Sequence, residues 1–110
     1  MAVPTVTSCL APLLRVLALE PAGLGCGLAQ DRVAQALGLS AEDMASELPS
    51  GGAAFRNRVA WAQVRLKRAG LTHSPAKGVW GVTTEGRAIL ALGADAAEDR
   101  LRRALGGRGS

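Results

Sequence analysis

Residues that build catalytic and metal centres are scarce in this chain. It has one histidine, two cysteines, one phenylalanine, two tryptophans and no tyrosine. His73 has no second ligand at a suitable spacing, which argues against a metal site, and the neighbouring Ser74 would point to the opposite face of a strand. Cys9 and Cys26 form no paired metal-ligand motif, so we expect reduced, partly buried thiols. We expect no catalytic residue, metal or cofactor.

Long apolar runs are also missing. No stretch approaches the ~20 apolar residues that a membrane-spanning helix needs. The amino-terminal segment has no basic start, and Arg15 interrupts its apolar stretch, so it does not read as a signal peptide. We therefore expect a cytoplasmic protein. A length of 110 residues predicts one domain with a small core, and the many Ala and Leu residues favour helix.

The charged residues are unevenly distributed. Residues 21–50 hold four acids and one base, whereas residues 56–87 hold seven bases and one acid. The net charge is only +4, but one half of the domain should carry a positive field and the other a weakly negative one. This asymmetry suits a polyanionic partner.

A basic helix is expected from residue 55 to the glycine at position 70. Its bases have no acidic residue among them. Gly70 can adopt the left-handed conformation that ends a helix. Apolar residues recur at alternating spacings of four and three, which predicts one narrow buried stripe. The stripe consists of Phe55, Val59, Ala62, Leu66 and Ala69.

Two strand-like runs follow at residues 71–74 and 78–82. Pro75, Ala76 and Lys77 bridge them as a turn. A basic helix that leads into a hairpin with a basic tip is typical of a winged helix-turn-helix domain. We therefore predict that fold class, mainly α with a small antiparallel β-wing.

The segment before the basic helix supplies the other helices that this fold needs. Thr5 is a good N-cap for a helix over residues 6–19, in which Pro12 either kinks the helix or marks its true start. A glycine-rich loop follows, and residues 27–28 are the candidate for a minimal strand. A second helix is expected over residues 29–37.

Two helices are expected after the hairpin. Thr83 should cap a helix over residues 84–92, and residues 95–105 read as an amphipathic helix with acids first and bases last. We divide the chain into a winged-helix domain at residues 1–93 and a carboxyl-terminal helix or linker at residues 94–110.

Several short motifs occur in an order and spacing that resemble one known family. They are Leu48-Pro49-Ser50-Gly51, Phe55, Asn57-Arg58-Val59, Trp61-Ala62, Leu66-Lys67, Ala69-Gly70-Leu71, Gly78-Val79-Trp80, Thr83 and Glu85-Gly86-Arg87. Together they resemble the N-terminal domain of Mrr-like restriction system proteins, from about residue 3 to residue 92. The resemblance implies a winged helix that precedes a nuclease domain and reads DNA, often modified DNA.

The catalytic motif of that family is absent from this chain. Nuclease chemistry of the Mrr type would need acids and a lysine that hold Mg²⁺ and activate water. Neither Lys67 nor Lys77 has an Asp or Glu two residues before it. We therefore predict a double-stranded DNA-binding module of a modification-dependent (type IV, Mrr-like) restriction system, either monomeric or a homodimer, that works with a nuclease domain or subunit.

Seven residues are the predicted DNA contacts. Arg56 and Asn57, early in the basic helix, are the best base-reading candidates, because Arg can fork onto guanine and Asn onto adenine. Lys67 and Arg68 lie late in the helix, where phosphate contact or plain solvation is expected rather than base readout. Lys77 at the wing tip suits a phosphate or the minor groove. The full set is Arg56, Asn57, Arg58, Gln63, Lys67, Arg68 and Lys77.

Four side chains can each be interpreted in two ways. Arg58 and Arg65 share one flank of the apolar stripe and either contact DNA or pair with acids elsewhere in the protein. Trp61 lies off the stripe and either packs under residues 48–51 or stacks at an interface. Trp80 either covers the small core, which is the favoured interpretation, or stacks on bases.

Two other functions fit the same fold. A stand-alone winged-helix transcriptional regulator would bind a palindrome as a dimer, with half-sites about one helical turn apart. Alternatively, the domain would dock onto an acidic protein through Trp61 and the basic face.

Overall fold

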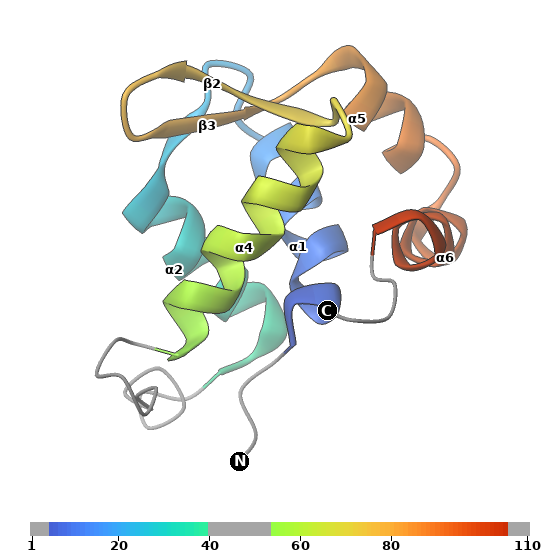
Figure 1. Ribbon diagram of the computed structural model, residues 1–110, viewed down its shortest axis with the longest axis horizontal. Coiled ribbons are helices and arrows are strands. Elements are labelled where there is room, and N and C mark those ends of the chain that lie inside the picture. Colours follow the sequence, from blue (N-terminus) through green and yellow to red (C-terminus); the bar gives the residue numbers. More distant parts are fainter. Residues whose placement is uncertain (1–4, 40–53, 106–110) are drawn as a thin grey trace.

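The structure is a computed structural model that describes residues 5–39 and 54–105. Its strands form one antiparallel sheet in the order β1-β3-β2, and this sheet lies across one end of the helices (Figure 1). The described elements follow one another as in a winged helix, which confirms the predicted fold class. In chain order they are α1 (Val6–Ala18), β1 (Leu24–Gly25), α2 (Cys26–Leu37), α4 (Ala54–Arg68), β2 (Thr72–Ala76), β3 (Val79–Val82), α5 (Thr84–Leu90) and α6 (Ala94–Leu105).

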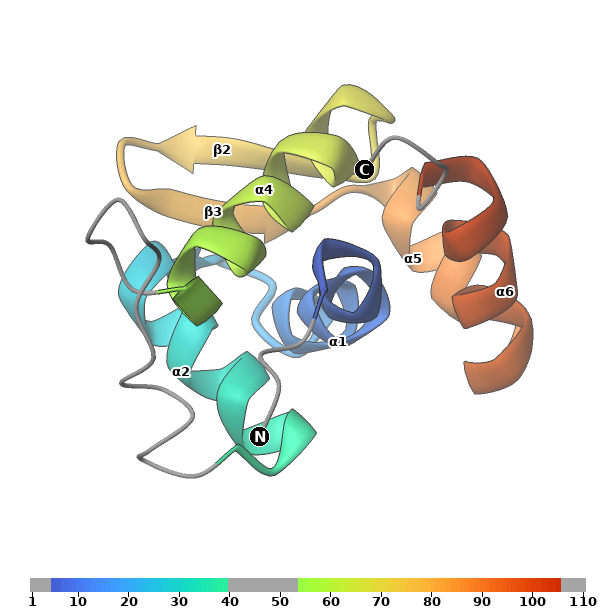
Figure 2. The same ribbon diagram turned by 60° about the horizontal axis from the view of Figure 1, so that its bottom comes forward.

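Helix α1 is the central element. It contacts α2, α4, α5, α6 and β3, and Figure 2 looks nearly along its axis, with α2 on one side and α5 and α6 on the other. The Thr5 hydroxyl accepts a hydrogen bond from the Ser8 amide at 3.1 Å, so the predicted N-cap is confirmed. The helix begins at Val6, and Pro12 is buried within it rather than at its start. Its predicted core residues Leu10, Leu13, Leu14 and Leu17 are all buried.

The predicted position of the first strand was wrong. Residues 27–28 belong to α2, which begins at Cys26, and the strand precedes them. Leu24 pairs with Trp80 of β3, and the Cys26 amide donates to the carbonyl of Gly78 at 2.8 Å. Leu24 is also buried, so the short strand is held by both pairing and packing. These contacts place the start of α2 three residues earlier than expected.

The turn of the wing is shorter than predicted. Pro75 and Ala76 belong to β2, and Ala76 pairs with Val79, which leaves only residues 77–78 in the turn. Gly78 has a φ of +73°, a conformation that favours glycine. The pairing is irregular between His73 and Ala76, where Pro75 supplies no N–H. A proline is tolerated there because β2 is an edge strand.

The wing is closed at its base by Thr83. Its hydroxyl donates to the carbonyl of Gly70 at 2.6 Å and accepts from the Gly86 amide at 3.1 Å. Its own amide donates to the carbonyl of Leu71 at 3.0 Å. Thr83 therefore caps α5 as predicted and also binds the end of α4, where Gly70 has the expected left-handed conformation. Helix α5 ends at Leu90, two residues before the predicted end.

Helix α6 packs on the domain rather than standing apart from it. Ala97 and Leu101 are buried, Leu101 belongs to the same core cluster as the leucines of α1, and α6 contacts α1 and α5. On the outer side, Arg102 pairs with Glu98 and Arg103 with Asp99. The predicted extent of this helix was correct to one residue, and the division of the chain at residue 93 stays a prediction.

Candidate nucleic-acid interface

One side of α4 packs in the hydrophobic core. Phe55, Val59, Ala62 and Leu66 are completely buried, which confirms the predicted apolar stripe up to that point. Ala69 was also expected in the stripe but is exposed, because the helix ends at Arg68. The buried stripe fixes which residues of α4 face outward.

The outward side of α4 carries a stripe of its own. Asn57, Trp61, Val64 and Arg68 recur at spacings of four, three and four, so they lie roughly opposite the buried stripe. Trp61 is 51% exposed and Arg68 is exposed, while Asn57 and Val64 are half-buried. Trp61 is therefore off the core, as predicted. Its expected packing partner, residues 48–51, lies outside the described residues.

Arg56 is held by α2. One guanidinium nitrogen donates to Oε1 of Gln30 at 2.6 Å, and another donates to Oδ1 of Asp31 at 2.7 Å. The Arg56 and Asp31 side chains are 41% and 54% exposed, so water screens this pair. A base contact by Arg56 would therefore have to replace these partners or use the remaining N–H groups. The sequence predicted Arg56 as a base reader and did not indicate these two partners.

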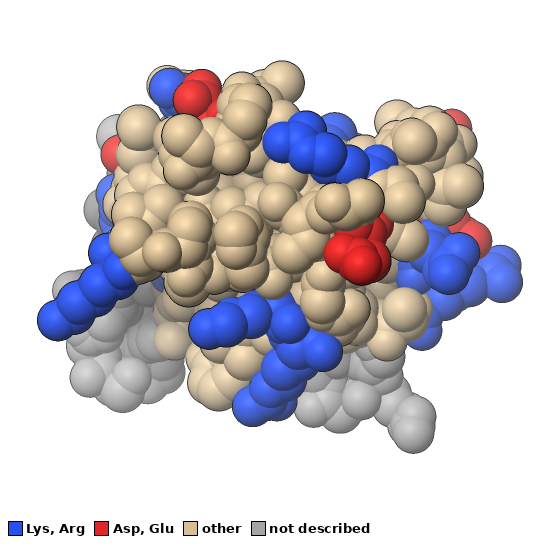
Figure 3. All heavy atoms as spheres, turned by 90° about the horizontal axis from the view of Figure 1, so that it is seen from above, with Lys and Arg blue, Asp and Glu red and all other residues tan. Residues whose placement is uncertain are grey.

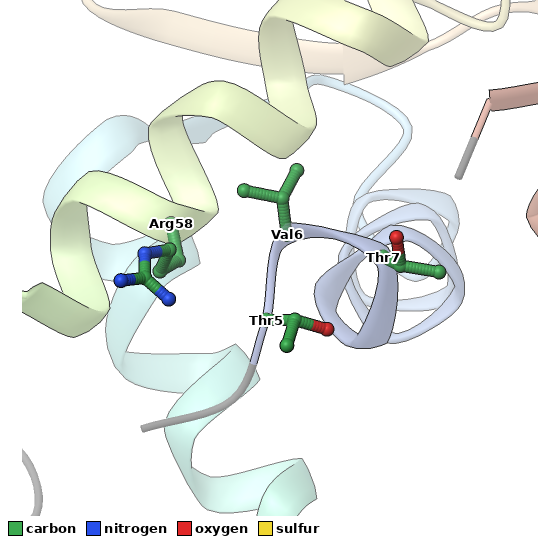
Figure 4. Close-up of a pocket in the computed structure, with 4 residues that line it drawn as sticks. All are labelled: Thr5, Val6, Thr7 and Arg58. Carbon is green, nitrogen blue, oxygen red and sulfur yellow. The ribbon is translucent and has the colours of Figure 1, made fainter. Parts of the chain in front are cut away.

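Arg58 lies beside the start of α1. Together with Thr5, Val6 and Thr7 it lines an open hollow of about 480 Å³ (Figure 4). The positive end of the α1 dipole and the guanidinium give this hollow a positive character. Burial raises the pKa of the nearby Cys9 thiol to about 11, and the charge of Arg58 acts in the opposite direction. Cys9 is a free buried thiol, and Cys26 is free and half-buried, as expected.

Arg65, on the same flank, contacts α6. Its guanidinium donates to the carbonyl oxygen of Leu105 at 3.1 Å, at the carboxyl-terminal end of that helix. This is a favourable position for a cation, because the last carbonyls of a helix carry partial negative charge. Of the two interpretations left open by the sequence, the structure favours an internal partner for Arg65, although that partner is a backbone carbonyl and not an acid.

Gln63 lies inside the protein. It is only 4% exposed, and within the described residues neither its amide nitrogen nor its amide oxygen has a hydrogen-bond partner. The hydroxyl of Thr72, in β2, is buried in the same way. Gln63 was predicted as a base contact, and that contact stays a prediction, but its amide is buried in this structure. Its polar type suggested the surface, and only the packing of neighbouring elements shows otherwise.

The remaining predicted cations are on the surface. Lys67 and Arg68 are exposed at the end of α4, and Lys77 is exposed in the turn of the wing. Seen from the side of the sheet, Lys and Arg side chains form several separate groups around the face, with acidic side chains between two of them (Figure 3). The structure thus brings exposed bases to both α4 and the wing. Trp80 is half-buried against the core, as its favoured interpretation required.

Two kinds of feature are not found in the part of the chain that the structure describes. No group of three or more His, Cys, Asp or Glu side chains there is arranged to hold a metal ion. No helix there has the length and apolar character needed to span a membrane.

Comparison with known proteins shows which family the sequence matches. The sequence pattern described as the Mrr N-terminal domain matches residues 7–92. A curated relative, the type IV methyl-directed restriction enzyme EcoKMrr of Escherichia coli (strain K12), is 41% identical over 86 residues. The matched part is 78% of this chain but only 28% of that relative, so the chain spans less than a third of the relative's length. No solved structure matches the chain.

Proposed function

Because the chain belongs to the Mrr N-terminal domain family, we propose that it binds double-stranded DNA as the target-recognition module of a modification-dependent restriction system. The observation that carries this proposal is the position of α4. This helix buries one stripe in a winged-helix core, presents the opposite stripe to solvent, has no acidic residue and leads into a wing with a lysine at its tip. Winged helices that bind DNA use these two elements.

In the proposed complex the outward stripe of α4 enters the major groove. Asn57, in the first turns of the helix, is placed to read a base edge, and Arg56 reaches the same region after exchanging its partners on α2. Lys67, Arg68 and Lys77 bind phosphates on either side. Arg58 is the remaining candidate, and a phosphate is its expected ligand because the hollow beside it is positive.

Strand cleavage is assigned to another part of the system. The relative's name describes a whole restriction enzyme, and the matched segment is 28% of it. We propose that this chain recognises the target and that a separate nuclease domain or subunit cuts it. The protein would then bind duplexes tightly without hydrolysing them.

Two kinds of residue should affect binding differently. Replacing Lys77 by Ala should weaken binding to all duplexes alike and flatten the salt dependence, because a phosphate contact carries no sequence information. Replacing Arg56 by Ala should relax the preference among duplexes, because a base contact is lost. Fluorescence anisotropy of labelled duplexes, unmodified and cytosine-methylated, at low and moderate salt, measures both effects.

Matched variants separate these roles from changes in structure. Asp31→Ala removes the ion pair between α4 and α2 but keeps the Arg56 guanidinium and its hydrogen bond to Gln30, so it should retain the preference. Arg100→Ala removes an exposed charge on α6 and should leave binding unchanged. Normal binding of every duplex by both Arg56→Ala and Lys77→Ala would show that the proposed contacts are wrong.

The same titration tests the two alternative functions. A transcriptional regulator of this fold would bind one palindromic duplex with a stoichiometry of two chains, and sedimentation of the complex would show it. A protein-docking domain would bind no duplex, even at low salt, and this result would overturn DNA recognition.

A further inference from the structure

The outward stripe of α4 has an apolar centre between two polar ends. Trp61 and Val64 are three residues apart, so their side chains are neighbours on the helix surface. Asn57 lies one turn before them and Arg68 one turn after. Trp61 is 51% exposed, although an indole gains much by burial. An exposed aromatic residue at the centre of a basic helix suits a partner that is both polyanionic and locally apolar.

The size of this apolar centre argues against a protein partner. Stable protein interfaces bury about 800 Å² on each side, and their centres contain few charged residues. Here two apolar side chains are flanked by Asn57 and Arg68, with Lys67 beside the stripe. Duplex DNA fits this arrangement better, because its phosphates complement the cations and its major groove has room for a helix.

The floor of the major groove offers very few apolar groups to such a helix. Base edges there present hydrogen-bond donors and acceptors, and the standard apolar group is the C5 methyl of thymine. A methyl group added at C5 of cytosine or at N6 of adenine occupies the same groove. An apolar pair that enters the groove therefore gains burial energy chiefly where a base carries a methyl group.

We propose that Trp61 and Val64 form the contact by which this domain recognises a methyl group on the major-groove edge of a base. The inference rests on the proposed function, since it requires α4 to lie in the major groove. Asn57 reads the neighbouring base by hydrogen bonds, and Arg68 fixes the register on a phosphate. The three sources of such a methyl group are thymine, 5-methylcytosine and N6-methyladenine, and binding experiments distinguish them.

The test uses one duplex library of fixed length and random sequence, prepared in four forms. The reference form contains the four ordinary bases. In the others, uracil replaces thymine, 5-methylcytosine replaces cytosine, or N6-methyladenine replaces adenine. Affinity is measured by competition against one labelled duplex. We expect at least one methylated form to bind more tightly than its unmethylated counterpart, by about fourfold for each methyl-sized group buried.

Variants of the apolar pair should remove this discrimination and keep binding. Trp61→Ala should bring the ratio of affinities for methylated and unmethylated duplexes close to one. Val64→Ser should lower this ratio, and Trp61→Phe should retain part of the preference. Leu92→Ser is the matched control, because Leu92 is also 51% exposed but lies after α5, away from α4. Circular dichroism during thermal unfolding confirms that each variant folds, which the exposure of Trp61 leads us to expect.

The outcomes separate this inference from the proposed function. If the protein binds all four forms equally, or if Trp61→Ala and Val64→Ser keep the original ratio, methyl recognition by this pair is refuted and DNA binding stands. If no form is bound at low salt, DNA recognition itself fails, and the inference fails with it.

Discussion

Gly86 occupies a position that has no space for a side chain. A Cβ atom placed there would overlap the carbonyl oxygen of Leu71, and it would lie 2.7 Å from Cγ2 of Val82 and 3.1 Å from Cδ1 of Leu14. One of these neighbours is backbone, and it also accepts the hydrogen bond of the Thr83 amide. We expect Gly86→Ala to lower the free energy of unfolding by about 1–3 kcal/mol, as other overpacked sites do.

Urea denaturation of Gly86→Ala measures this change, and Gly27→Ala is its control. A Cβ at Gly27 would meet nothing within 4 Å, and the residue lies in the first turn of α2. Since alanine is the better helix former, that variant should be neutral or more stable by up to about 1 kcal/mol. Equal stabilities for the two variants would show that the contact between α5 and Leu71 is looser than the structure indicates.

At this scale the sequence predicted exposure better than it predicted contacts. The spacing of Phe55, Val59 and Leu66 defined the buried side of α4, and it placed Trp61 correctly outside the core. Gln63 is next to that stripe on the helix, so neighbouring elements decide whether it is covered. Here it is covered, and no pattern within the helix could have predicted that.

At the scale of elements, helices with side-chain caps were predicted well. Thr5 and Thr83 each accept a backbone hydrogen bond in the first turn, and both helices begin where expected. Helix α2 lacks this signal, because Gly25 precedes it and offers no side chain for capping. The two-residue strand β1 is too short to show any periodicity. It exists because β3 is available for pairing, which is a property of the folded chain.

Helix α6 should contribute to the stability of the whole domain. Leu101 is 1% exposed and belongs to the core cluster. We expect Leu101→Ala to destabilise the protein by about 2–4 kcal/mol, through lost burial and an unfilled cavity. Arg100→Ala, at the neighbouring exposed position, should change stability by less than about 0.5 kcal/mol. Thermal unfolding measures both variants, and an unchanged Leu101→Ala would support the division of the chain at residue 93.

For the whole molecule, the arrangement of charge matters more than its net value. The exposed Lys67 and Arg68 lie at the end of α4, whereas Arg102 and Arg103 are each paired with an acid on α6. Removing Lys67 and Arg68 together should reduce the slope of log K against log salt by nearly 2, because each phosphate contact contributes about 0.9.

The variant that lacks Arg102 and Arg103 loses the same net charge and serves as the control. Its slope should stay close to that of the parent protein, since those bases lie outside the proposed interface. Anisotropy titrations between about 50 and 200 mM salt give the three slopes. If both double variants lowered the slope equally, DNA binding would depend only on the net charge of the protein.

The three hydrogen bonds of Thr83 also determine how the wing can move. Two of them, to the carbonyls of Gly70 and Leu71, join the segment that enters the hairpin to the segment that leaves it, and the third, from the Gly86 amide, caps α5. The first two bonds restrict rotation of the hairpin about its base. In the proposed complex, Lys77 would adapt to different duplexes through bending of the two strands or through its own flexible side chain. In that complex, the stiffness of the hairpin would therefore limit the range of DNA groove widths that the wing tip can fit.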